Sequence, residues 1–502
     1  MAFRPRSTCL AKAALAGLLV LAACQPASVT PSPSPTPSSG GSPSASFGTP
    51  AADLTISEEL RAALEPEGIQ QHLDQLLEIA VANDGIRAAG TAGYTASVSY
   101  VADELRAAGY EVIVDEFTFP FFIETAPAQL SANDQTFVGA DHLHALIFSA
   151  SGDITAPVVV VAVSDDGQPI GSGGCDRDDW VDFPAGAVAV VGAGPCARRQ
   201  MVDHAQTAEA AALIVSSPEY EPGSLRRPTL RTPDGIDIPA VYASGPAGAA
   251  LRQAAAAGTS VHLSVRTLIE DRVTANVIAE RPGIGVGNVA AEVVMVGGHL
   301  DSVLDGPGIN DNGSGTMTIL EVAQQLAELE PTPRTVRFAF WSAEELGLYG
   351  SRDWVGRQSD DQLHAIVAYL NLDMLASSNY GRFVYAASGI ADSEEITAAF
   401  EAYFDAVGLT YETLDLGGGS DHAPFDDALV PNGGLFSGAT ELKTDPQAER
   451  FGGSAHQPMD RCYHLACDRP DQINETALDE LSDAAAHVLM LLLTGGSPSG
   501  SG

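Results

Sequence analysis

The chain has 502 residues, more than one ordinary hydrophobic core holds, which indicates two folded units with attached segments. Hydrophobic residues make up 45% of it and charged residues 18%, a composition typical of globular domains. The formal net charge is −40, from 65 acidic and 25 basic side chains. This balance argues strongly against nucleic acid as a partner, because phosphate binding needs basic patches.

The first 23 residues have the pattern of a lipoprotein signal peptide. Three basic residues, Arg4, Arg6 and Lys12, precede an apolar run over residues 13–23 that is too short to span a bilayer. The run ends in Leu-Ala-Ala before Cys24, which resembles a lipobox. We expect cleavage before Cys24 and lipidation of its thiol. The alternative is plain secretion after a small-residue cleavage site.

Both ends of the remaining chain have low-complexity sequences. Residues 24–55 are rich in Pro and Ser and predict a semi-extended tether, and the Gly/Ser-rich residues 494–502 predict a disordered tail. The folded part is therefore expected outside the cytoplasm of a bacterium, attached to the membrane only through the lipid anchor, or secreted.

The folded region begins with two amphipathic segments. Apolar residues recur at helical spacing over residues 69–80, and a second helix is predicted over residues 94–108. An alternating strand over residues 110–119 follows, and Pro120 and Pro127 are expected to end it.

Residues 125–265 have a different sequence pattern from the helical segments before them. Short apolar strands are predicted over residues 158–163, 188–191 and 212–215, with one helix over residues 198–212 and no cluster of catalytic residue types. The segment resembles a protease-associated domain, a β-rich module without chemistry of its own, and the paired cysteines Cys175 and Cys196 are part of that resemblance. The alternative is an unrelated β-rich insertion.

From residue 290 onward, strands alternate with helices. Strands are predicted over residues 292–298, 334–340 and 366–372, and helices over residues 315–329 and 346–356. This order predicts an α/β fold with a mainly parallel central sheet covered by helices. Ligands bind beyond the carboxyl ends of the strands in such sheets.

Polar side chains suited to metal binding follow each of these strands. They are His299 and Asp301, Asp311 in a glycine-rich segment before the first helix, Glu344 with Glu345, and Asp373. Helix capping would explain one carboxylate per helix, but it explains neither two adjacent glutamates nor a histidine at a strand end. Imidazole and carboxylate groups suit Zn²⁺, and the charges of Asp311, Glu345 and Asp373 favour two ions.

The two adjacent glutamates point in different directions on any regular backbone. One can therefore bind metal while the other acts as a general base. Asp301 is placed two residues from His299, where it can accept the second N–H of that imidazole.

A loop near the C-terminus offers a second histidine. Cys462 and Cys467 flank Tyr463 and His464 and could close a tight disulfide in an oxidising compartment. The alternative, a Cys/His zinc knuckle, is disfavoured because only two cysteines are present there.

These stretches resemble the secreted di-zinc aminopeptidases of the Streptomyces type, which are co-catalytic zinc exopeptidases. The matching stretches are residues 299–302, 306–315, 343–347, 370–374, 420–425, 433–436 and 460–464. The resemblance covers most of residues 290–490. It implies a zinc exopeptidase domain over residues 56–124 and 266–493, interrupted by the protease-associated domain over residues 125–265.

The resemblance also implies a role for each site residue. Asp311 would bridge two zinc ions, with His299 and His464 on one ion and Glu345 and Asp373 on the other. Glu344 would be the general base and then the acid that protonates the leaving amine. Tyr463 would donate a hydrogen bond to the tetrahedral oxyanion. His422 would lie beside the ligands without binding metal.

The resemblance further implies peptide substrates with a free N-terminus and a monomeric enzyme. The substrate's amine would lie near Glu344, Asp373 and a carbonyl around Gly419, a position where close relatives carry Arg. Met374, Gly418, Phe436 and the region of residues 462–467 would line an apolar pocket, which predicts Leu, Met or Phe as the first residue.

Some relatives also bind calcium. The acids at the equivalent positions are Asp479 and Asp483, but the N-terminal partner of that site is not recognisable in this sequence.

Three other functions fit the same scaffold. A glutaminyl cyclase would use one zinc and no site for a free amine. A carboxypeptidase would need a cationic clamp for a carboxylate, and cations are scarce around these motifs. A binding protein that had lost its metals should lack ligands or the base, whereas all five ligands and Glu344 are present.

Overall fold

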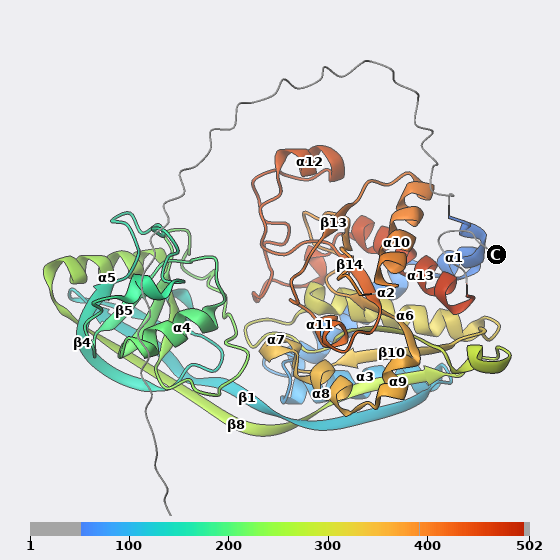
Figure 1. Cartoon of the computed structure of the whole chain (residues 1–502), viewed down its shortest axis with the longest axis horizontal. Coiled ribbons are helices and arrows are strands. Elements are labelled where there is room, and N and C mark those ends of the chain that lie inside the picture. The colour runs from blue at the N-terminus through green and yellow to red at the C-terminus, as the bar shows by residue number, and fades with distance from the viewer. Residues whose placement is uncertain (1–51, 391, 496–502) are drawn as a thin grey trace, which may run out of the picture. The chain divides into compact units, whose positions relative to one another are not determined.

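The computed structural model describes residues 52–390 and 392–495 (Figure 1). The predicted signal peptide, Cys24, nearly all of the tether and most of the tail lie outside the described residues. Within the described ranges, no helix combines the length and apolar character that crossing a membrane requires.

The predicted N-terminal helices are confirmed. They follow a short helix α1 (Glu58–Ala63) and are α2 (Pro66–Ala82) and α3 (Ala92–Ala107). Helix α2 buries Ile69, Leu73 and Leu76, which lie on one face at helical spacing. Thr91 caps α3 by accepting a hydrogen bond from the backbone N–H of Tyr94.

The strand predicted to end before Pro120 is much longer than expected. Strand β1 (Glu111–Ala132) continues through both prolines and pairs antiparallel with β8 (Ser260–Arg281), and Figure 1 shows the two running side by side. The prolines are tolerated because β8 is the one partner of β1 until β2 (Gln135–Val138) joins at residue 129, which leaves the other edge of β1 free around Pro120.

The zinc exopeptidase domain expected over residues 56–124 and 266–493, called the catalytic region below, is built on a mainly parallel sheet, as predicted. Its strands lie in the order β13-β12-β14-β11-β9-β10-β8, with β14, β11, β9 and β10 parallel. The strands are β9 (Val293–His299), β10 (Thr335–Trp341), β11 (Ile366–Leu372), β12 (Phe383–Tyr385), β13 (Glu412–Leu414) and β14 (Asn432–Phe436). The helices are α6 (Gly315–Glu328), α7 (Glu344–Gly347), α8 (Tyr349–Arg357), α9 (Asp360–His364), α10 (Ser393–Val407), α11 (Ala423–Asp427), α12 (Asp445–Phe451) and α13 (Glu475–Leu493).

Helices cover both faces of this sheet. Val294 and Val296 of β9 belong to one apolar cluster with residues of α2, α3, α6 and α13. Val293 and Met295 belong to another cluster, with Trp354 of α8 and Phe425 of α11. Because alternate residues of a strand face opposite sides, the near-continuous apolar sequence of β9 is explained by burial on both faces.

The predicted helix over residues 346–356 is divided. Helix α7 ends at Gly347, Leu348 takes a left-handed conformation with φ 63°, and α8 begins at Tyr349. The break follows directly after Glu344 and Glu345, so the two glutamates occupy a separate short turn.

The inserted region contains a second set of parallel strands. These are β4 (Gly152–Val160), β5 (Val188–Val191), β6 (Ala212–Ser216) and β7 (Ala240–Ala243), with β3 (Leu143–Ala145) antiparallel to β7. The predicted helix is α4 (Arg198–Thr207), which ends earlier than expected because Ala212 begins β6, and α5 (Gly245–Ala257) follows β7. The expected disulfide between Cys175 and Cys196 is present.

Candidate metal centre

The ends of three parallel strands bring the candidate ligands together. His299 is the last residue of β9, Asp373 follows β11, and Glu344 and Glu345 begin the turn after β10. Strand β9 pairs with both β10 and β11, so these side chains meet at one sheet edge. Asp311 approaches the same edge from the turn that precedes α6.

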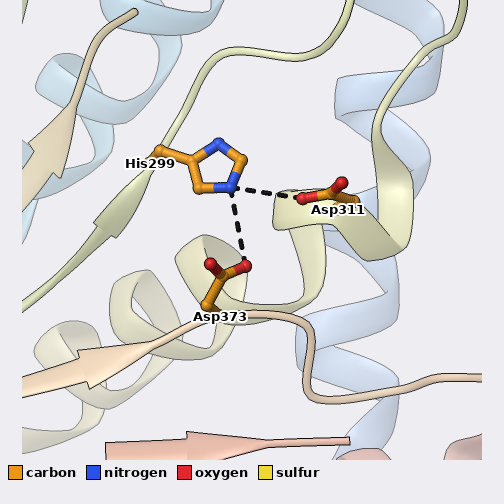
Figure 2. A group of neighbouring side chains, drawn as sticks. All are labelled: His299, Asp311 and Asp373. Carbon is orange, nitrogen blue, oxygen red and sulfur yellow. Dashed lines mark ion pairs between the residues drawn. The ribbon is translucent and has the colours of Figure 1, made fainter. Parts of the chain in front are cut away.

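The candidate ligand atoms form three groups of three, and two of these groups share Asp311. In the first, His299 Nε2 lies 3.2 Å from Asp311 Oδ1 and 3.5 Å from Asp373 Oδ1, as Figure 2 shows. In the second, His464 Nε2 lies 3.0 Å from Asp311 Oδ2 and 3.1 Å from Glu345 Oε2. Each oxygen of Asp311 therefore faces a different histidine.

This grouping corrects the division of ligands implied by the resemblance. His299 lies with Asp373, and His464 lies with Glu345. The sheet order explains why, since β9 separates β11 from β10 and hence Asp373 from Glu345. Strands β11 and β10 are therefore two strand spacings apart, about 9.6 Å, whereas the ligand atoms of one zinc ion lie within about 4 Å of each other.

Several buried oxygens in these groups lack hydrogen bonds. Asp311 Oδ2, Asp373 Oδ1 and Glu345 Oε1 have no hydrogen-bond partner among the described residues. Burying a carboxylate oxygen costs free energy unless the oxygen accepts a hydrogen bond or coordinates a cation. Atoms that approach one another without forming hydrogen bonds are arranged as ligands around a common point. Their chemistry, imidazole nitrogen and carboxylate oxygen, fits zinc.

The electrostatics of the centre also favour a cation. Burial alone would lower the pKa of His464, but Glu345 and Asp311 raise it to about 10. Burial would also lower the pKa of His299, but nearby carboxylates, with Glu344 the strongest, raise it well above its ordinary value. The carboxylates therefore stabilise positive charge at both histidines.

Glu344 lies beside the two groups. One of its carboxylate oxygens is within 4.8 Å of ligand atoms of His299 and Glu345. Burial, together with the neighbouring carboxylate of Glu345, raises the pKa of Glu344 well above its ordinary range, although His299 opposes the shift. A carboxyl group with a raised pKa is suited to accepting and returning a proton.

Asp301 contacts this glutamate more closely than the imidazole that it was expected to orient. Its Oδ1 accepts a hydrogen bond of 3.2 Å from the backbone N–H of Glu344 and lies 3.9 Å from His299 Nδ1. The backbone carbonyl of Asp301 lies nearer to that nitrogen, at 3.1 Å.

Sequence reasoning missed two residues that fix the turn carrying Asp311. Asp468 accepts hydrogen bonds from the backbone N–H groups of Asn310, at 2.7 Å, and Asp311, at 3.1 Å. The fully buried Arg87 donates to the carbonyls of Leu300, at 2.5 Å, and Gly308, at 2.6 Å. Asp468 follows Cys467 directly, but a single arginine near the N-terminus gives no sequence signal for its role.

The loop around His464 has the predicted disulfide, between Cys462 and Cys467. The ring of Tyr463 stacks on that of His464 with centroids 3.8 Å apart. Burial, followed by the charges of Asp311 and Glu345, raises the pKa of the Tyr463 hydroxyl well above its ordinary value. The hydroxyl therefore stays protonated and can donate a hydrogen bond.

The residues expected in the substrate pocket lie in two places. Met374 and Phe436 belong to one apolar cluster, against which Tyr463 packs. Gly418 and His422 line a neighbouring cavity of about 310 Å³. The backbone N–H of Gly419 donates to Leu416, in the turn before Ser420.

Ser420, for which the sequence predicted no role, and His422 both lie next to the ligands. Ser420 donates a hydrogen bond of 2.6 Å to Asp373 Oδ2 and so orients that ligand. His422 packs against Tyr385, with ring centroids 5.1 Å apart, and belongs to neither ligand group.

The two acids considered for calcium lie on α13 and belong to none of the groups of three candidate metal ligands found in the described part of the chain. Asp483 Oδ2 lies 3.6 Å from Arg61 Nη1, so a protein cation already accompanies this carboxylate.

Comparisons with known proteins agree with the motifs and the fold. Residues 276–489 match the profile of Peptidase family M28, and residues 154–251 match that of the PA domain. An aminopeptidase of Pseudomonas aeruginosa strain UCBPP-PA14 is 38% identical over 441 residues, which cover 86% of this chain and 81% of that protein. The probable lipoprotein aminopeptidase LpqL of Mycobacterium tuberculosis is 38% identical over 447 residues, 86% and 85% of the two chains.

Two solved structures share the fold. The aminopeptidase from Aneurinibacillus sp. strain AM-1 has a TM-score of 0.67 at 23% identity, covering 87% of this chain and 95% of that chain. The zinc aminopeptidase BSAP from Bacillus subtilis has a TM-score of 0.65 at 24% identity, covering 84% and 94%. The resemblance stated from the motifs, inserted domain included, is confirmed.

Proposed function

This chain belongs to peptidase family M28 with an inserted PA domain, and from that premise we propose that it is a zinc-dependent aminopeptidase. It would hydrolyse the first peptide bond of substrates with a free N-terminus and prefer apolar first residues. The observation that carries the proposal is the pair of ligand groups that share Asp311, with Glu344 beside them.

Five residues would hold two zinc ions. His299 and Asp373 would bind one ion, Glu345 and His464 the other, and Asp311 would contribute one oxygen to each. Zinc, when bound, supplies Lewis acidity that polarises a carbonyl group and lowers the pKa of water. The zinc aminopeptidase from Bacillus subtilis, which shares the fold, supports this choice of metal.

Glu344 would move the proton in the reaction. Its carboxylate accepts a proton from the attacking water and returns it to the nitrogen of the leaving amine. The raised pKa of this buried carboxyl group makes it a stronger proton acceptor than an exposed glutamate. Asp301 positions the glutamate through the hydrogen bond that it accepts from the backbone of Glu344.

The other functional residues would bind the substrate. The protonated Tyr463 hydroxyl donates a hydrogen bond to the developing oxyanion. The free amine lies near Glu344, Asp373 and the backbone at Gly419. The apolar cluster that contains Met374 and Phe436 accepts the first side chain, which favours Leu, Met and Phe.

The enzyme would act outside the cytoplasm, held to the membrane by a lipid on Cys24. The lipobox-like sequence and the two disulfides support this location. The similar protein LpqL is named as a probable lipoprotein aminopeptidase.

A panel of chromogenic amides tests the proposed reaction. Leucyl, methionyl and phenylalanyl p-nitroanilides should be cleaved faster than the glutamyl compound. A chelator should abolish cleavage, and added Zn²⁺ should restore it. N-acetyl-leucyl p-nitroanilide is the matched control and should remain intact. Equal cleavage of the acetylated compound, or full activity in the presence of the chelator, would contradict the proposal.

A further inference from the structure

A cleft of about 520 Å³ joins the candidate metal centre to the inserted domain. The catalytic region contributes Tyr463 and His464 to its lining. The inserted domain contributes three arginines, Arg198, Arg226 and Arg231, and two tyrosines. The cleft therefore reaches a proposed zinc ligand on one side and a basic wall on the other.

The segment that carries this wall is fixed to the catalytic region. Arg227 is 9% exposed and pairs with Glu124, at 2.6 Å, and Asp305, at 3.0 Å. Thr229 donates to the carbonyl of Leu346 at 2.9 Å, and Tyr349 donates to the backbone carbonyl of Arg231 at 2.8 Å. These contacts hold the arginines at a set position beside the centre.

Most of the hydrogen-bond donors of Arg226 are unused among the described residues. Its Nε donates a hydrogen bond of 3.1 Å to the carbonyl of Tyr463, and its guanidinium carbon lies 5.9 Å from the centre of that ring. Neither Nη group has a hydrogen-bond partner among the described residues. The side chain of Arg231 likewise has none in that part of the chain.

Neither Arg226 nor the exposed Arg231 is paired with a carboxylate among the described residues. The chain has 65 acidic side chains, yet no described carboxylate lies within 4.0 Å of Arg226 or Arg231. Burial lowers the pKa of Arg226, and the electrostatic effects of Tyr463 and Asp460 only partly oppose the shift. A partly buried guanidinium without a carboxylate partner is suited to binding an anion from outside the chain.

The position of the cleft identifies which part of a peptide would meet these arginines. Of the residues proposed to bind the first side chain, Met374, Gly418 and Phe436 do not line it, whereas Tyr463 and His464 of the loop over residues 462–467 do, so the cleft begins beside that pocket. The residues after the scissile bond are therefore the part of a substrate that enters the cleft.

We propose that Arg226, with Arg231, binds the terminal carboxylate of a short peptide and makes di- and tripeptides the preferred substrates. The proposal rests on the proposed aminopeptidase function. A guanidinium forms two parallel hydrogen bonds with a carboxylate, and a neutral amide cannot replace them. An acidic side chain at the second position offers the same chemistry, so the experiment must separate the two sources.

Kinetics on three matched substrates test this inference. Leu-Gly should have a kcat/KM about tenfold higher than Leu-Gly amide, mainly through a lower KM. Leu-Glu amide should resemble Leu-Gly amide, because its carboxylate is not at the terminus. In Arg226→Gln the ratio of Leu-Gly to Leu-Gly amide should fall toward one, and in Arg231→Gln it should fall less.

Arg177→Gln is the matched control, because Arg177 is an exposed arginine of the inserted domain outside the cleft. It should keep the wild-type ratio. Arg231→Gln tests the wall even if Arg226→Gln disturbs the loop, since only the backbone carbonyl of Arg231 contacts Tyr349.

Two results would overturn the inference alone. One is the absence of an effect of the terminal carboxylate: the wild type cleaves Leu-Gly and Leu-Gly amide equally, or both arginine variants keep the wild-type ratio of Leu-Gly to Leu-Gly amide cleavage. The other is a preference for Leu-Glu amide over Leu-Gly. Cleavage of N-acetyl-Leu-Gly that depends on Arg226 would instead overturn the proposed aminopeptidase function, since it would show a carboxypeptidase with the same carboxylate contact.

Discussion

The catalytic region and the inserted domain both contain parallel strands, but their strand ends carry different residues. In the catalytic region, β9 ends at His299 and β11 is followed by Asp373. In the inserted domain, β5 is followed by Gly192, and β6 and β7 by Ser217 and Ser244. The carboxyl edge of a parallel sheet can thus hold a functional site. Whether a site is present there depends on which residue types follow the strands.

The two regions also use buried charge differently. The catalytic region gathers histidines and carboxylates, and several of the buried carboxylate oxygens lack hydrogen bonds, an arrangement that fits a cation. The inserted domain presents arginines without carboxylate partners to the same cleft, an arrangement that fits an anion. We infer that the insertion contributes to substrate binding while the chemistry stays in the catalytic region.

The largest effect is expected at Glu344. Glu344→Gln keeps the size of the side chain but removes the group that accepts a proton, so kcat should fall by about 10²- to 10⁴-fold. Metal content, measured by atomic emission, should stay that of the wild type. Glu209→Gln changes an exposed glutamate of the inserted domain and should leave kcat unchanged. A Gln variant near wild-type activity would show that Glu344 is not the base.

The two disulfides separate stability from activity. The Cys175–Cys196 bond spans 21 residues and the Cys462–Cys467 bond spans 5, so chain entropy predicts losses of about 3 and about 2 kcal/mol in the free energy of unfolding when each pair is changed to serine. Leucyl amide cleavage should fall mainly in Cys462→Ser/Cys467→Ser, because that loop carries Tyr463 and His464.

Denaturant unfolding and steady-state kinetics on the two double variants check this expectation. Activity that fell equally in both, after correction for the unfolded fraction, would remove the distinction between the regions.

The smallest expected effect is the loss of stability in acid that comes from buried histidines. Each region buries a histidine: burial lowers the pKa of His144 in β3, and it lowers that of His487 in α13 to about 4. Between pH 6.5 and 4, His487 therefore binds more protons in the unfolded than in the folded chain, and its contribution to stability falls as the pH falls. One such group changes the free energy of unfolding by at most about 1.4 kcal/mol per pH unit.

Urea unfolding of His487→Gln should therefore show a shallower loss of stability over this pH window than the wild type. His364→Gln, at an exposed position, should follow the wild type. Identical pH profiles for all three proteins would contradict the burial argument.

Much of the catalytic fold follows from the sequence because its signals are local. The apolar segments predicted β5 and β11 with the bounds that the structure has, and the polar residues after β9, β10 and β11 predicted which side chains meet. Strand β1 was predicted too short, since the sequence does not show that its prolines lie where one edge of the strand is free.

The features that were missed depend on contacts between distant segments. The ligands could not be divided correctly between two ions without the order of β11, β9 and β10 in the sheet. Arg87 contacts carbonyls more than 200 positions away, and Arg226 reaches Tyr463 across 237. Neither arginine has neighbours in the sequence that indicate its partner.

The central claim is that two metal ions share Asp311, and diffraction at the zinc absorption edge tests it most directly. Crystals of the zinc-loaded wild-type protein should show two anomalous peaks, one among His299, Asp311 and Asp373 and one among Asp311, Glu345 and His464. A single peak, or peaks away from these two groups, would contradict the account.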